Sequence, residues 1–346
     1  MKKSRLPLSE RQQIVLRALV RAYVGAAAPV GSATLSQTLS VKLSSASIRN
    51  TMAELAELGL IEQPHASAGR LPTEQGLRLF VDELMRAHDV VGWERRTIAM
   101  QMGELGVDDP LEAASTVLAE RTRQLGFAVL PRLDRVALRH VSLIRLSRER
   151  VLVVLVSLSG AAYQRILNDD RSGAQAELER IEAEFNQRLG GHSLLELREL
   201  LEVERERLRG RAAELQHRTL LAAVRALTGE ARARGDVLLS SRTLVLEQPE
   251  FHDPERVRGL LLAVEAREAL LTFLDRVLEQ PGVAVTFGGE VGLPELRDCA
   301  VVTAPCAAGA ESLGLVGVLG PSRMDYPRVV PLVELLSELV AEKMVA

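Results

Sequence analysis

The segment from Leu43 to Thr73, LSSASIRNTMAELAELGLIEQPHASAGRLPT, constrains the fold of this chain more than any other. Ser44 is placed to cap a short helix, because its hydroxyl can accept hydrogen bonds from the free N–H groups of the first turn. Gly59 then suits the residue that ends the helix. Residues 60–63 and 70–71 read as two short strands around a turn-rich loop. A helix followed by such a hairpin predicts the working end of a winged helix-turn-helix domain that binds duplex DNA.

The residues on either side complete a compact domain. Ser9 and Gln12 form a capping box that opens a first helix, with Gly25 just past its end, and Ser32 opens a second. Thr73 caps a further helix that runs to about Met85. Residues 1–88 hold eleven Lys or Arg against seven Asp or Glu, a net charge of +4, whereas the whole chain is −3 and the remainder therefore −7. A basic domain on an acidic body favours phosphate contact at one end.

The helix that begins after Ser44 has two different faces. Ile48, Met52 and Leu55 recur at helical spacing, so we expect them to pack inward. The opposite face is small and nearly uncharged, and in the major groove arginine suits guanine and asparagine suits adenine. An ordinary amphipathic surface helix would show the same spacing. The candidate DNA-binding residues are, on the helix, Ser45, Ala46, Ser47, Arg49, Asn50 and Ala53, and near the loop, His65, Ser67 and Arg70.

The remaining chain alternates strands and helices. Residues 127–130, 138–146, 151–158 and 161–167 predict strands of one mostly antiparallel sheet. A helical stretch follows, in which leucines recur at heptad spacing at 194, 201, 208 and 215. The companion positions are polar, so these leucines fit either a helix pair that packs on another subunit or an internal bundle core. Strands resume at 237–246, 283–287, 299–303 and 314–319, before a helix over 326–344.

Residues typical of catalysis or metal binding do not form a recognised pattern. Cys299 and Cys306 have no C-x-x-C spacing, so we expect small buried side chains rather than metal ligands. We expect a solvated turn at Asp169-Asp170. Nucleophile elbow, phosphate-binding loop and zinc-binding helix patterns are missing, which predicts no enzyme, metal or cofactor. With no apolar run long enough to span a bilayer, we expect a cytoplasmic protein without membrane contact.

Two long motifs resemble those of a known family. They are PVGSATLSQTLSVKLSSASIRNTMAELAELGLIEQPHASAGRLPT from Pro29 and LGPSRMDYPRVVPLV from Leu319, with NDD and PEFHDPE between them. Together they resemble the heat-inducible transcription repressor family HrcA over nearly the full chain. The resemblance implies a homodimer that represses chaperone operons by binding an inverted-repeat (CIRCE-like) operator on double-stranded DNA, is released on heat stress, and depends on the GroEL-type chaperonin.

The resemblance also implies an architecture. The predicted fold class is α+β: an N-terminal winged helix-turn-helix over 1–88, a discontinuous GAF-like α/β domain over 89–168 and 247–346, and an inserted helical and β dimerisation domain over 169–246. Two other functions stay open. The GAF-like domain could sense a small molecule, and a body of this size could hide a catalytic site that sequence patterns miss.

Overall fold

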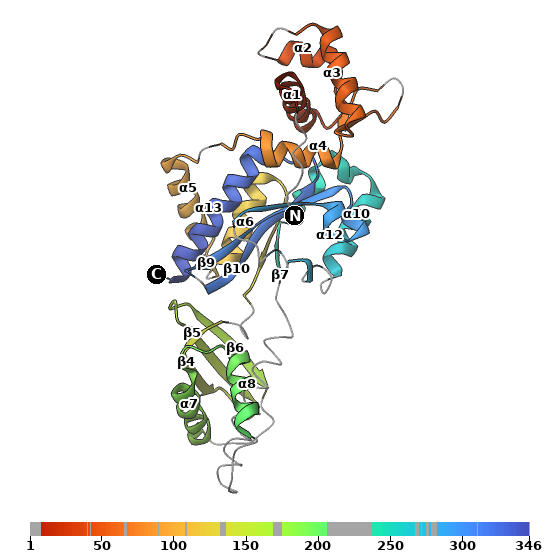
Figure 1. Ribbon diagram of the computed structural model, residues 1–346. Coiled ribbons are helices and arrows are strands. Elements are labelled where there is room, and N and C mark those ends of the chain that lie inside the picture. Colours follow the sequence, from red (N-terminus) through yellow and green to blue (C-terminus); the bar gives the residue numbers. More distant parts are fainter. Residues whose placement is uncertain are drawn as a thin grey trace.

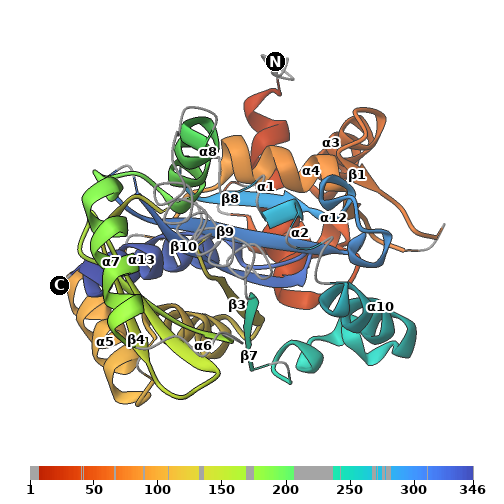
Figure 2. The ribbon, with the colours of Figure 1, turned by 90° about the horizontal axis from the view of Figure 1, so that it is seen from below.

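The computed structural model describes residues 8–39, 41, 43–65, 68–88, 90–107, 109–131, 136–168, 175–205, 237–241, 243–266, 270, 272–274, 277, 282–309 and 311–345. Three units follow one another along the molecule (Figure 1). We call them the head (residues 8–88), the central sheet unit (described residues of 90–131 and 237–345) and the small sheet unit (described residues of 136–205). Seen from below, the small sheet unit (yellow-green to green) is the part nearest the viewer (Figure 2).

Three helices begin the head: α1 (Glu10–Ala26), α2 (Ser32–Thr38) and α3 (Ser45–Glu57). The predicted capping box of α1 is confirmed, because the Ser9 hydroxyl accepts from the Gln12 amide while the Gln12 side chain accepts from the Ser9 amide. The prediction that Gly25 lies past the end of α1 was wrong. The helix continues through Gly25, and Ala27 takes the left-handed conformation instead, with φ of 52°. Its N–H closes the last turn on the Tyr23 carbonyl.

The limits of α3 match the prediction closely. The Ser44 hydroxyl accepts from the Ser47 amide at 3.1 Å, which satisfies one free donor of the first turn. At the other end Gly59 has a φ of 72°, a conformation that glycine adopts without strain. Its N–H donates to the Ala56 carbonyl, and the next N–H, of Leu60, donates to the Leu55 carbonyl. These two bonds form a Schellman motif, so the helix ends as the sequence predicts.

A short hairpin and a further helix complete the head. The hairpin strands are β1 (Ile61–Glu62) and β2 (Leu71–Pro72), and they pair antiparallel. Thr73 caps α4 (Glu74–Leu79), as predicted, and the chain then forms a π-helical turn over Phe80–Leu84. The head core is apolar and joins all of these elements: Val15, Leu16, Leu19, Leu35, Ile48, Met52, Leu55, Leu60, Leu77 and Phe80 are buried.

The central sheet unit is built on five antiparallel strands in the order β7-β3-β10-β9-β8. Their bounds are β3 (Leu125–Val129), β7 (Val237–Ser240), β8 (Ala284–Phe287), β9 (Cys299–Ala308) and β10 (Glu311–Pro321). Alternate side chains point to opposite faces. Phe127 and Leu315 therefore join one apolar cluster, and Ala128 and Val316 join the other. Both faces of the sheet are thus covered.

Helices on the two sides of this sheet come from different parts of the chain (Figure 1). On one side lie α5 (Gly92–Glu104), α6 (Pro110–Thr122) and α13 (Tyr326–Val345). On the other side lie α10 (Pro254–Glu265) and the short α12 (Gly288–Val291), with 3-10 turns at Val245–Glu247, Pro249–His252 and Pro294–Leu296. Of these, α12 directly follows β8, which forms one edge of the sheet.

The small sheet unit has its own antiparallel sheet in the order β4-β5-β6. Its elements are β4 (Leu138–Arg145), β5 (Arg150–Ser157), β6 (Ala162–Asn168), α7 (Gln175–Leu189) and α8 (Leu194–Arg205). Two side chains of α7 reach the backbone of β4: Asn186 binds both polar groups of Val141, and Glu182 accepts from the Leu143 amide at 2.8 Å. These contacts cover backbone groups that an edge strand leaves unpaired.

Two strand predictions were wrong. The strands predicted within one sheet belong to two, since β3 pairs with β7 and β10, whereas β4, β5 and β6, among the described strands, pair only with one another. The strand predicted over 237–246 ends at Ser240, where Ser241 takes a φ of 53° that breaks the extended chain. The domain limits, with an inserted unit over 169–246, stay a prediction. The leucines at 208 and 215 and the pair Asp169-Asp170 lie outside the described residues.

Candidate nucleic-acid interface

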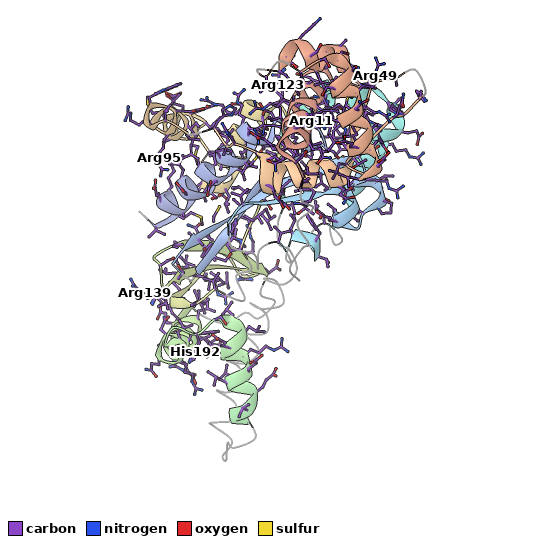
Figure 3. The ribbon with its side chains drawn as sticks, turned by 45° about the horizontal axis from the view of Figure 1, so that its top comes forward. Arg11, Arg49, Arg95, Arg123, Arg139 and His192 are labelled. Carbon is purple, nitrogen blue, oxygen red and sulfur yellow. The ribbon has the colours of Figure 1, made fainter. Side chains whose placement is uncertain are left out.

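The outward face of α3 lies on the head, at the opposite end of the molecule from the small sheet unit. Figure 3 shows Arg49 there, and His192 at the far end. Ala46, Arg49, Asn50 and Ala53 are all exposed, while the opposite stripe is buried. This side of α3 is therefore narrow and bears a single arginine, which is the shape and charge that a duplex groove admits.

Two candidate serines lie at the edge of this face. Ser45 is half-buried, and its hydroxyl oxygen lies 3.2 Å from that of Ser32 at the start of α2. Ser47 is also half-buried, and its carbonyl accepts from the Thr51 hydroxyl at 3.1 Å. Ser45 thus links the first turns of α2 and α3, so it contributes to the orientation of α3 as well as to its surface.

A polar contact that sequence reasoning missed fixes α3 against α1. The Gln12 amide donates to one Glu54 carboxylate oxygen at 2.9 Å, and the Arg11 guanidinium lies 3.7 Å from the other. Both members of the Arg11–Glu54 pair are substantially exposed, and a surface pair of this kind stabilises a fold by at most about 1 kcal/mol. Its main effect is local, because it offsets the negative charge of Glu54 on the helix that we expect to approach DNA.

Two hydrogen bonds within the hairpin loop close it. The Gln63 side chain donates to the Ala68 carbonyl at 3.0 Å, and the Ala68 N–H donates to the His65 carbonyl at 2.9 Å. His65 is exposed at this turn, whereas Ser67 lies outside the described residues. Arg70 is half-buried and forms an antiparallel bridge with Val30, through two backbone hydrogen bonds of 2.9 Å. The loop is therefore anchored to the segment between α1 and α2.

Each described candidate residue thus lies on α3 or on the hairpin, and none is buried in the core. Helical spacing and turn composition could place them, because both signals are local in sequence. Contacts with DNA remain a prediction for all of them. Sequence reasoning found no role for two arginines, Arg78 and Arg323, which join the head to the central sheet unit.

The described residues contain no group of three or more His, Cys, Asp or Glu side chains placed to bind a metal ion. Both cysteines are buried free thiols, as predicted. Burial raises the pKa of Cys306 to about 12, and burial with the nearby Asp298 raises that of Cys299 to about 12. Reactive cysteines have lowered pKa values, so neither thiol has the character of a nucleophile. No described helix is long and apolar enough to cross a membrane.

A small pocket lies in the central sheet unit. Its volume is ≈60 Å³, and its lining includes Glu250, Arg256, Asp298 and Cys299. Pockets for small-molecule ligands typically measure roughly 300–1,000 Å³. This pocket therefore suits a few water molecules and gives no support to a small-molecule sensor.

Comparison with known proteins relates this chain to transcription repressors. Residues 108–330 match the family described as HrcA protein C terminal domain. A heat-inducible transcription repressor HrcA of Methylococcus capsulatus is 38% identical over 336 residues, which cover 96% of this chain and 95% of the relative. The HrcA of Geobacter sulfurreducens is 32% identical, with 96% and 97% coverage. The crystal structure of a hypothetical protein shares the fold, with a TM-score of 0.61 and 24% identity over 98% of this chain and 99% of that one.

These matches first define a class, since the relatives are transcriptional repressors and not enzymes. The predicted absence of catalytic function agrees with that class. The chain belongs to the HrcA family of heat-inducible transcription repressors.

Proposed function

We propose that the head is a winged helix-turn-helix domain that binds duplex DNA with α3 in the major groove. The observation that carries this proposal is the exposed, small and nearly uncharged face of α3 beside an anchored hairpin loop. Arg49 and Asn50 would read base edges, because each can make two hydrogen bonds to one purine. Ala46 and Ala53 would let the helix approach closely, since neither carries a long side chain.

The other candidates would contact the backbone of the duplex. Ser45 and Ser47 lie in the first turn of α3, where hydroxyls and free N–H groups can donate to phosphate. His65, Ser67 and Arg70 would reach phosphate or the minor groove from the hairpin. Such contacts fix the register of the protein on DNA and contribute affinity without reading sequence.

We further propose that the chain is a homodimer that uses the small sheet unit. One face of its sheet carries the cross-strand row Ile144, Leu152 and Ile166, and Ile144 and Ile166 are 44% and 46% exposed. A second copy that packs on this face would remove the apolar row from water. Because a two-fold dimer presents two equal heads, its preferred operator is an inverted repeat.

The family relationship supports the rest of the proposal. The repressor would bind a CIRCE-like operator ahead of chaperone operons in the cytoplasm, leave it on heat stress, and depend on the GroEL-type chaperonin to reach its active form. The central sheet unit would be the GAF-like domain and the small sheet unit its insertion, since β3 and β7 flank that unit in sequence and pair with each other. Adding purified chaperonin to an operator-binding assay tests the last dependence. An unchanged active fraction would remove it.

A gel-shift comparison of Arg49→Ala and Asn50→Ala with the unaltered chain tests DNA recognition. Loss of a bidentate base contact is expected to weaken specific binding by about 1–3 kcal/mol, or about 5- to 150-fold. The control is Arg96→Ala, which removes an exposed arginine of α5 in the central sheet unit. If both α3 variants bind the operator as tightly as the control, these residues do not read bases.

A further inference from the structure

Two arginines cross the junction between the head and the central sheet unit in opposite directions. Arg323 belongs to the turn between β10 and α13 and reaches the end of α1, while Arg78 belongs to α4 and reaches β8 and α12. Their side chains are only 11% and 19% exposed. Both guanidinium groups therefore make their contacts largely out of water, where the strength of a charge-assisted hydrogen bond depends strongly on its geometry.

The Arg323 guanidinium uses all three of its nitrogens. One terminal nitrogen donates to the Val24 carbonyl in the head at 3.0 Å. The other donates to the Gln248 side chain at 3.1 Å and to the Glu250 carboxylate at 3.0 Å, and Nε donates to the second Glu250 oxygen. The pair with Glu250 is a bidentate fork, so it fixes the plane of the guanidinium and aims its free edge at α1.

The acceptor in the head is a carbonyl of the last turn of α1. Such carbonyls have no partner within their own helix, and they carry the negative end of the helix dipole. The last turn of α1 contains no basic residue. Arg323 therefore supplies from the central sheet unit the positive charge that a helix usually takes from its own sequence. The contact depends on the relative orientation of the two units.

Arg78 forms the matching contact from the head. It donates to the Val285 carbonyl at 2.7 Å and to the Glu290 carboxylate, and its guanidinium carbon lies 4.7 Å from the centre of the Phe287 ring. One turn earlier on α4, the Glu74 carboxylate accepts from the Gly289 amide at 3.3 Å. α4 thus holds the region from β8 to α12 at two points.

The segment that links the head to the central sheet unit is hydrogen-bonded to the central sheet unit close to these arginine contacts. The His88 N–H donates to the Pro327 carbonyl at 2.9 Å. Tyr326, which precedes Pro327, is buried and packs edge-to-face on Phe287, with ring centres 5.8 Å apart. The GPSRMDY motif therefore lies at the junction, away from the proposed DNA-binding face, and meets the PEFHDPE motif through Arg323 and Glu250.

We infer that Arg323 and Arg78 are positioning residues for operator binding: they fix each head on its central sheet unit and so set the distance and angle between the two α3 helices of the dimer. This inference rests on the proposed dimeric repressor. Once one head of the dimer is bound to its half-site, a second head that is held in the right orientation meets the other half-site at a higher effective concentration. Loosening the junction weakens the two-headed complex and leaves each head able to bind.

Full-length Arg323→Gln and Arg78→Gln are compared with the unaltered chain by gel shift on two duplexes, the inverted repeat and a single half-site. The expected result is a loss of about tenfold on the inverted repeat and less than about twofold on the half-site. The matched control is Arg95→Gln, which removes a guanidinium that also binds two carboxylates, Glu338 and Glu342 at 2.7 and 2.6 Å, but within one unit. It should bind both duplexes normally.

Equal losses on both duplexes, or no loss on either, overturn the inference. If Arg323→Gln does not fold, Glu250→Gln replaces it, because the amide keeps the shape of the carboxylate and removes the charge that fixes the fork. If the unaltered chain does not prefer the inverted repeat, the proposed function fails instead. Hydrogen exchange over residues 85–91 then tests the junction alone. Faster exchange in Arg323→Gln than in Arg95→Gln supports the role of Arg323 in fixing the junction, and equal exchange overturns that role.

Discussion

Gly69 controls how the hairpin loop is anchored to the head. A Cβ atom at this position would lie 2.5 Å from the carbonyl carbon and oxygen of Val30 and 2.8 Å from its nitrogen. All three are backbone atoms, which cannot rotate away as a side chain can. Gly69→Ala therefore has to separate two backbone segments. Because the φ of Gly69 is not in the left-handed region, the cost of the substitution is steric and includes no backbone strain.

The expected magnitude follows from the bonds that bridge these segments. Moving a 2.5 Å contact to an ordinary 3.4 Å requires a shift of about 0.9 Å, which would stretch both 2.9 Å hydrogen bonds between Val30 and Arg70 beyond bonding distance. At about 0.5–1.5 kcal/mol each, their loss costs about 1–3 kcal/mol locally. We expect hydrogen-exchange protection of the Val30 and Arg70 amides to fall about 5- to 150-fold. Operator affinity should fall too, since Arg70 leaves its place.

The matched control is Gly25→Ala, in the last turn of α1. A Cβ there meets nothing within 4 Å, so alanine should stabilise the helix by about 0.5–1 kcal/mol. If Gly69→Ala left both amides as protected as in Gly25→Ala, the bridge between Val30 and Arg70 would not depend on the close approach at Gly69. The account of how the hairpin is positioned would then be wrong.

Two further predictions concern the other units. Ile166→Asp should shift the protein from dimer to monomer in analytical ultracentrifugation, because it places a charge in the proposed interface. The control is Leu261→Asp on α10, which changes a leucine of matching exposure (47%) and should leave the dimer intact. If Ile166→Asp stayed dimeric, this sheet face would not be the interface. Burial raises the pKa of Cys306 to about 12 from 9.0, so the neutral thiol favours the folded state up to about pH 9 and this contribution is lost as pH rises toward 12. Between about pH 9 and 12, the unfolding free energy of Cys306→Ala should fall less steeply with pH than that of the unaltered chain, by about 1.4 kcal/mol per pH unit. Equal slopes for the two proteins in denaturant titrations at alkaline pH would contradict the assigned burial of Cys306.

Local signals made most helices predictable. The caps at Ser9, Ser44 and Thr73 act within three residues of themselves, and the inward stripe of α3 follows from helical spacing. Both the position and the exposed face of α3 could therefore be predicted from the sequence. Gly25 misled because a glycine near a helix end resembles a stop signal, and only Ala27 shows where the left-handed turn falls.

Long-range pairing could not be predicted in the same way. Leu125 pairs with Leu319, and nothing near either residue selects that partner over the adjacent strand β4. The contacts of Arg323 with Val24 and of Arg78 with Glu290 likewise join distant parts of the chain. Arg323 lies in a motif that carries the family resemblance, but its contact with the head depends on how α1, β10 and α13 are arranged in space (Figure 1).

Selection of bound duplexes from a random pool tests the central claim most directly, because it reads recognition, symmetry and half-site spacing at once. The account predicts enrichment of an inverted repeat with one fixed spacing, and loss of base preference at particular positions in Arg49→Ala or Asn50→Ala. Recovery of unrelated sequences, or of a site without two-fold symmetry, would contradict a dimer that reads DNA with the exposed face of α3.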